Sequence, residues 1–203
     1  MRIPDNVLND VAIYVKRLFD EHSEPWLLYH NIAHTWRVVQ HAAEIGKFYA
    51  LNEQQTFVLQ TAAWFHDAGQ LFGDMEMHEQ TGVDLMKMYL GRKETSFSIQ
   101  EEIAACIMAT KMPVQPVTLL EKILCDADTY HLGTPDFEQL DNLVWQELAL
   151  RTHKPVIDPI GKSLQFLQTH TYYTDYCRQL LSAGKEKNIV LLQRKKESET
   201  PAG

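Results

Sequence analysis

The chain has 203 residues, which is long enough for one domain with a sizeable hydrophobic core. Its formal net charge of −8 argues against duplex nucleic acid as a partner, because proteins that bind duplexes present a basic surface. No apolar run approaches the ~18 residues of a membrane span, and three widely spaced cysteines indicate no disulfide framework. We therefore expect a cytoplasmic protein with reduced thiols and no membrane partner.

Apolar residues recur at three- and four-residue steps along most of the chain, which is typical of amphipathic helices. Such runs cover residues 7–19, 38–48, 57–65, 83–90, 99–108, 117–127, 137–150 and 159–169, followed by a Tyr-rich stretch that ends near residue 192. Glycine and proline signals separate them, and strand alternation is scarce. The pattern predicts an all-α, single-domain helical bundle of about eight to ten helices over residues 1–193. Residues 194–203 are expected to be a frayed, charged tail.

Histidines and carboxylates fall near the predicted ends of these helices. His34 lies in the first turn of one helix, and His66-Asp67 follows the apolar run that Gly69 is expected to end in a left-handed conformation. Two adjacent ligands can meet at one ion where a helix ends and the backbone turns. This arrangement predicts a metal site at the centre of the bundle.

A later helix supplies two further carboxylates, Asp126 and Asp128. Residues two apart on a regular helix do not point toward the same centre, so only one of them is expected to bind the ion. Mixed nitrogen and oxygen ligands suit Zn, Mn, Fe, Ni or Mg. The set is typical of a catalytic metal site.

Three segments carry a resemblance to a known family. Tyr29-His30-Asn31-x-x-His34, Trp64-Phe65-His66-Asp67-Ala68-Gly69 and Cys125-Asp126-Ala127-Asp128-Thr129-Tyr130 resemble the H…HD…D signature of the HD-domain phosphohydrolases. By these motifs the resemblance covers roughly residues 25–135. Later motifs, at residues 109–113, 131–133 and 170–176, are similar to a bacterial subgroup of predicted metal-dependent phosphohydrolases.

The resemblance implies a set of metal ligands and catalytic residues. The ligands would be His34, His66, Asp67 and Asp128, with Asp126 as the alternative fourth ligand. Asp67 would also steer the attacking water. The segment around His30 is similar to the corresponding stretch of the cyclic-nucleotide phosphodiesterases, where the first histidine protonates the leaving group, and His30 is expected to do the same here.

The sequence departs from the binuclear members of that superfamily at Thr110-Lys111, where those members place a further histidine. One divalent ion is therefore expected, and a second, for which His78 is the candidate ligand, is less favoured. We expect His78 and Lys111 to face phosphate oxygens instead. Arg37, one turn after His34, either contacts phosphate or pairs with an acid on its own helix.

The predicted function is metal-dependent hydrolysis of a phosphomonoester or phosphodiester of a small molecule, with a nucleotide as the favoured substrate. One alternative is a nucleotide-sensing module without turnover, and a di-iron oxygenase is less favoured because it needs more ligands. A homo-oligomer remains open. The cluster Met75, Met77, Met86 and Met88 is expected mostly to pack in the core and loops, with Met75 and Met77 as candidates for the mouth of a substrate pocket.

Overall fold

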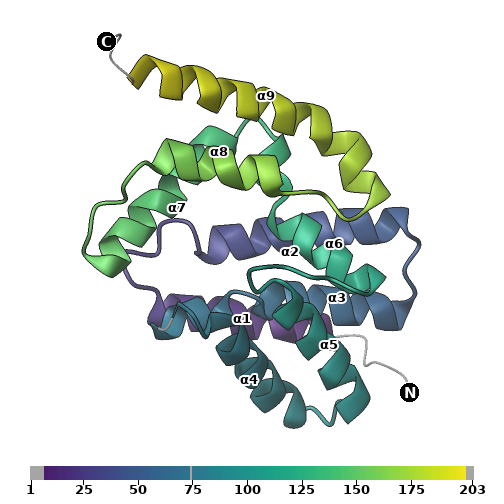
Figure 1. The fold of residues 1–203 in the computed structure, drawn as a ribbon. Coiled ribbons are helices and arrows are strands. Elements are labelled where there is room, and N and C mark those ends of the chain that lie inside the picture. The colour runs from purple at the N-terminus through teal and green to yellow at the C-terminus, as the bar shows by residue number, and fades with distance from the viewer. Residues whose placement is uncertain (1–6, 74, 200–203) are drawn as a thin grey trace. The chain divides into compact units, whose positions relative to one another are not determined.

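The computed structural model describes residues 7–73 and 75–199, and within these ranges the chain forms nine α-helices, two 3-10 helices and no strand (Figure 1). The predicted all-α fold is confirmed. The chain divides into two compact units: unit 1 holds the described residues of Met1–Pro25 and His30–Asp128, and unit 2 those of Trp26–Tyr29 and Thr129–Gly203. The prediction of one domain over residues 1–193 stays a prediction, and each unit is described by itself.

Unit 1 is built around one buried helix. Its elements are α1 (Val7–His22), α2 (Ile32–Phe48), α3 (Glu53–Phe65), η1 (Ala68–Phe72), α4 (His78–Gly91), α5 (Phe97–Ala109) and α6 (Leu119–Asp128). Helix α3 packs against α1, α2, α5 and α6, and most of its residues from Phe57 to Phe65 are buried. Because other helices surround α3, the residues that follow its last turn emerge inside unit 1.

Side chains at the helix ends fix where α2 and α3 begin. Asn31 precedes α2, and its side-chain oxygen accepts hydrogen bonds from the backbone N–H groups of Ala33 and His34, at 2.9 and 3.1 Å. Asn52 caps α3 in a reciprocal capping box with Gln55. Asparagine is a favoured residue at this position because its oxygen satisfies amides that have no partner within the helix. The Asn31 cap holds the backbone of His34 in the first turn of α2.

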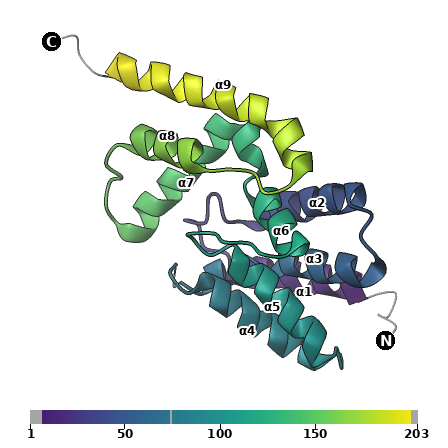
Figure 2. The same cartoon turned by 45° about the vertical axis from the view of Figure 1, so that its right-hand side comes forward.

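Unit 2 combines a short early segment with the last third of the chain. Its helices are η2 (Tyr130–Gly133), α7 (Phe137–Thr152), α8 (Pro159–Thr169) and α9 (Asp175–Glu199), and α8 packs along α9 (Figure 2). Their core contains Leu132, Phe137, Leu167, Ile189 and Leu192. Residues 194–199 of the predicted tail continue α9, and residues 200–203 lie outside the described residues.

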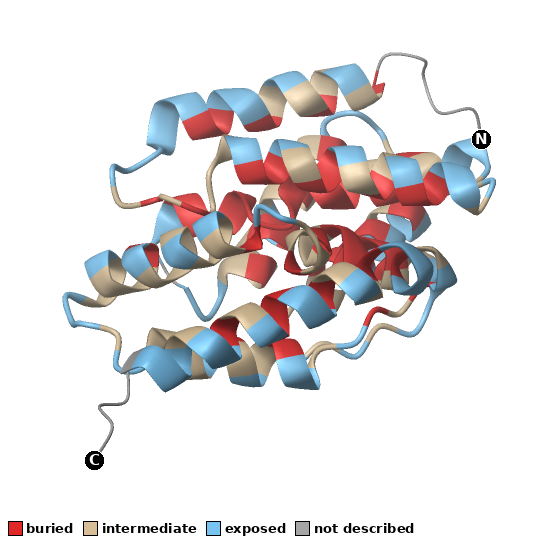
Figure 3. Ribbon diagram, turned by 90° about the horizontal axis from the view of Figure 1, so that it is seen from above, coloured by how far each residue is buried: buried red, intermediate tan, exposed pale blue. Residues whose placement is uncertain are grey.

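Burial follows the amphipathic pattern that the sequence predicts. Most helices carry buried residues along one side and exposed residues along the other, as the alternating colours of Figure 3 show. None of the described helices is both long and apolar enough to cross a membrane.

Candidate metal centre

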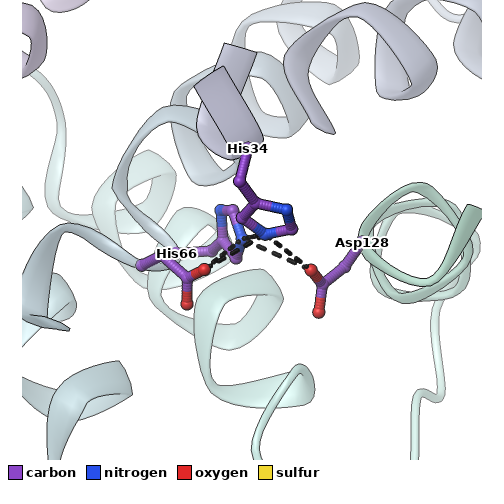
Figure 4. A group of neighbouring side chains, drawn as sticks. His34, His66 and Asp128 are labelled. Carbon is purple, nitrogen blue, oxygen red and sulfur yellow. Dashed lines mark hydrogen bonds and ion pairs between the residues drawn. The ribbon is translucent and has the colours of Figure 1, made fainter. Parts of the chain in front are cut away.

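Four side chains of unit 1 converge on one point. His34, His66, Asp67 and Asp128 each offer one ligand atom, and these four atoms lie within 4.8 Å of one another. Figure 4 shows the rings of His34 and His66 and the carboxylate of Asp128 turned toward each other. His34, His66 and Asp67 are buried, whereas the Asp128 side chain is 28% exposed. The group therefore lies in the interior of unit 1 and opens toward solvent on the side of Asp128.

Three separate elements deliver these side chains. His34 lies in the first turn of α2, His66 and Asp67 follow the last residue of the buried helix α3, and Asp128 is the last residue of α6. The backbone of His66 is still helical, whereas Asp67 has φ −109° and ψ 2° and begins the turn into η1. This change of direction lets two consecutive residues face the same point.

The hydrogen bonds of His66 fix which of its nitrogens faces the group. Its Nδ1 lies 2.8 Å from the carbonyl oxygen of Ala63, and because a carbonyl can only accept, Nδ1 carries the proton. In the neutral ring, Nε2 then presents a lone pair, and it faces His34 Nε2 at 3.4 Å. Backbone support of this kind is typical of metal-bound histidines.

The carboxylates surround these two nitrogens. Asp67 Oδ2 is buried and lies 3.2 Å from Nε2 of both His34 and His66. Asp128 Oδ1 lies 3.1 Å from His34 Nε2. Two imidazole nitrogens and two carboxylate oxygens that converge in this way form a ligand set suited to a divalent cation. The residues present therefore fit a divalent metal ion.

The electrostatics of the group also favour positive charge at its centre. Burial is the largest influence on the pKa of His66 and lowers it, but the charges of Asp67 and Asp128 outweigh burial and place the pKa well above the ordinary value. Burial raises the pKa of Asp67 and Asp128, yet their contacts with the two histidines hold both values below the ordinary range. Without an ion, a bound proton would have to supply the charge that the carboxylates require.

Gly69 has a different role from the predicted one. Of the described glycines only Gly73 has a positive φ, and α3 ends four residues before Gly69, so the prediction that Gly69 closes the helix in a left-handed conformation was wrong. Gly69 lies in η1, where a β-carbon would overlap the carbonyl oxygen of His78. On α4, a β-carbon at Gly82 would lie 2.5 Å from the carbonyl oxygen of Phe65. The two glycines let α4 approach the HD turn closely.

A cleft of about 570 Å³ leads to the candidate metal ligands. Asp67 and Asp128 lie both in the ligand group and in the wall of this cleft. The rest of the lining comes from His30, from the segment before α4, from the first turn of α4 and from the residues that follow α5. These residues are His30, Met75, Glu76, Met77, His78, Glu79, Thr110, Lys111 and Met112. The His30 ring lies edge-on to that of His34, with centroids 5.9 Å apart.

His78 and Lys111 are both held by the short segment before α4. His78 Nδ1 donates to the Met75 carbonyl oxygen at 2.7 Å, and Lys111 Nζ donates to the Glu76 carbonyl oxygen at 2.8 Å. The opposite nitrogen of His78, Nε2, lies 3.5 Å from Asp67 Oδ1. The structure thus brings His30, His78 and Lys111 to the cleft whose wall includes Asp67 and Asp128.

Two sequence-predicted candidates lie elsewhere. Asp126 is fully buried on α6 and is not a member of the four-residue group, in line with its spacing of two residues from Asp128. Arg37, on α2, is not among the described residues that line the cleft.

The sequence did not single out Glu79. Its side chain is 6% exposed, with Oε1 3.3 Å from His78 Nε2 and Oε2 3.9 Å from Lys111 Nζ. An acidic residue in the first turn of a helix is common because it favours the positive end of the helix dipole, so Glu79 carried no distinct signal. Met112 also lines the cleft. Because it directly follows Lys111, the sequence could have identified it as a residue of the cleft.

Comparisons with known proteins agree with this fold. A model of the HD domain family matches residues 31–133. A predicted HD superfamily hydrolase from an uncultured Thermotogales bacterium is 19% identical, with a TM-score of 0.60 over 95% of this chain and 93% of that chain. Bacillus subtilis YpgQ, solved in complex with ADP, is 18% identical, with a TM-score of 0.64 over 96% of this chain and 98% of that chain. At these identities the two structures establish the fold alone. No curated protein matches the sequence.

Proposed function

Because the chain belongs to the HD domain family, we propose that it is a metal-dependent phosphohydrolase that cleaves a phosphate ester of a small molecule, with a nucleotide as the substrate class. The observation that carries this proposal is the group of four ligand atoms at a cleft that also contains His30, His78 and Lys111. A cation site beside a basic side chain and two imidazoles is suited to a phosphate ester.

His34, His66, Asp67 and Asp128 would hold one divalent ion. Such an ion supplies a Lewis acid for the phosphoryl oxygens and lowers the pKa of water toward neutrality. A second ion is less favoured, although His78 stays its candidate ligand. A di-iron centre stays the least favoured alternative, because the group offers four ligand atoms.

The side chains around the group have separate tasks in this proposal. Asp67 has its Oδ2 in the ligand group and its Oδ1 toward His78, so that it can orient a water molecule at the floor of the cleft. Lys111 Nζ and the His78 ring balance charge on the non-bridging phosphate oxygens. His30 donates a proton to the departing oxygen, a task for a group that titrates near neutral pH.

Two observations support a nucleotide as the substrate. The cleft volume of about 570 Å³ lies within the range of pockets that bind small organic molecules. YpgQ, which has a similar fold, was solved with ADP. Cytoplasmic location and homo-oligomerisation stay predictions.

A metal-supplemented substrate screen tests the proposal. The purified chain is stripped of metal, reloaded separately with Zn²⁺, Mn²⁺, Ni²⁺, Fe²⁺ or Mg²⁺, and assayed for phosphate release from nucleoside mono-, di- and triphosphates and from cyclic nucleotides. We expect turnover with at least one ion, and loss of turnover in Asp128→Ala. A nucleotide that binds tightly without product formation would support the sensor alternative and contradict the enzyme proposal.

A further inference from the structure

The cleft carries an apolar surface beside its charged floor. On the basis of the phosphohydrolase function proposed above, we propose that Met75, Met77 and Met112 form a leaving-group subsite that takes the nucleobase of a nucleotide. These three residues are called the methionine wall below.

The methionine wall is exposed where it lines the cleft. Met75, Met77 and Met112 are 36%, 46% and 59% exposed, and all three line the cleft that contains Asp67 and Asp128. Exposed apolar side chains that gather in a concave site are typical of ligand binding, whereas single ones scattered on a surface need no explanation.

Hydrogen bonds of the segment before α4 place the methionine wall beside His78 and Lys111. The Met75 carbonyl oxygen accepts the His78 Nδ1 proton, and the Met77 carbonyl oxygen accepts both the N–H and the hydroxyl of Thr81, at 2.9 and 3.0 Å. Met112 directly follows Lys111, whose Nζ is held by Glu76. Met75 is therefore hydrogen-bonded directly to His78, and Met112 lies next to Lys111 in the chain.

The chemistry of the thioether selects the kind of group that the methionine wall accepts. Methionine sulfur is polarizable and makes favourable contacts with aromatic rings, worth about 0.3–1.5 kcal/mol each. A sugar, with a hydroxyl on nearly every carbon, would lose hydrogen bonds to water against this surface and gain none. A nucleotide meets both requirements, because its flat base can contact the methionine wall while its phosphate lies at the charged floor of the cleft. Because methionine is flexible, we expect the subsite to accept purines and pyrimidines alike.

A matched pair of substrates isolates the nucleobase. AMP and ribose 5-phosphate share the same phosphate ester and differ by the base, so their ratio of kcat/KM measures the contribution of the methionine wall. Met77→Ala and Met112→Ala are compared with Met88→Ala, a methionine on α4 that is 49% exposed and does not line the cleft. Binding of adenosine, which has no phosphate, is measured in parallel by calorimetry with the metal-free protein.

We expect the parent protein to prefer AMP through a lower KM. Each wall substitution should raise the KM for AMP and weaken adenosine binding by between about twofold and tenfold, with kcat and all values for ribose 5-phosphate little changed. Met88→Ala should match the parent. Equal use of AMP and ribose 5-phosphate by the parent, or equal losses on both compounds in the wall variants, would overturn the subsite. If no phosphate ester is hydrolysed but adenosine binding falls in the wall variants alone, the subsite stands and the hydrolase proposal fails.

Discussion

A β-carbon on Gly69 would overlap the backbone carbonyl oxygen of His78. Gly69 belongs to the 3-10 turn that follows the two HD residues, and His78 opens α4. The absence of a side chain at residue 69 therefore allows the first turn of α4 to lie against the turn that orients Asp67. His78 Nε2 reaches within 3.5 Å of Asp67 Oδ1 as a result.

Substitution of Gly69 should disturb both stability and the cleft. Gly69→Ala must displace backbone atoms of α4, not a flexible side chain, and we expect it to lower the free energy of unfolding by about 1–3 kcal/mol, the usual cost of overpacking. Urea denaturation measures this change. Gly91→Ala is the control, since nothing lies within 4 Å of a β-carbon there. An equally stable Gly69→Ala protein would contradict the close approach.

Loss of either HD residue should remove the metal but not the fold. His66→Ala and Asp67→Ala each delete a ligand, so bound metal and turnover should both be lost while the circular dichroism of the helices stays near that of the parent. Elemental analysis by mass spectrometry measures the metal. His153→Asn, in the left-handed C-cap of α7 and outside the ligand group, should behave like the parent. A metal-free variant with full activity would refute the assignment.

The role proposed for His30 predicts a substrate-dependent loss. His30→Ala should retain the metal and lower nucleotide turnover by ~10²–10⁴-fold, the usual scale for general acid–base catalysis. On p-nitrophenyl phosphate the loss should be small, because p-nitrophenolate leaves without protonation. Steady-state kinetics on both compounds distinguish the two cases. Equal losses would assign His30 to phosphate binding or to structure.

Stability should decline at alkaline pH because of a buried thiol. Burial, followed by the charges of Glu121 and Glu102, raises the pKa of Cys106 from 9.0 to about 12. A thiol whose pKa is raised by folding stabilises the protein fully below pH 9 and loses that contribution as the pH rises toward 12. The parent should therefore lose up to about 1.4 kcal/mol per pH unit through this group, relative to Cys106→Ala. Urea denaturation between pH 8 and 10.5 measures the difference, and parallel pH profiles would contradict it.

The sequence predicted the ligand group better than its surroundings. The spacing of His34, His66-Asp67 and Asp128 was informative because helix ends and family motifs coincide at these residues, and the structure brings the four together. The role of Gly69 was mistaken, since a sequence reports that a residue lacks a side chain but not which backbone approaches it. Glu79 was missed for a similar reason. Its contacts with His78 and Lys111 depend on how α4 packs beside α5.

Arg37 is a second residue whose surroundings the sequence could not predict. Its position one turn after His34 allowed either a phosphate contact or a pairing with an acid on its own helix, because the direction of a side chain on a helix depends on where the helix starts and what packs on it. Asn31 sets that start at Ile32. The sequence showed that α2 would be amphipathic, but not that none of its described residues would line the cleft.

Helices α4 and α5 are held together at the cleft end, where His78 and Lys111 both donate to carbonyls of residues 75 and 76. The opposite end is the turn between Gly91 and Phe97, in which Arg92, Lys93 and Glu94 are exposed. Insertions are best tolerated at exposed loop tips. This turn is accordingly the preferred place for a fluorescent label, a short affinity tag or a grafted peptide, because extra residues there are separated from the cleft by the full length of both helices.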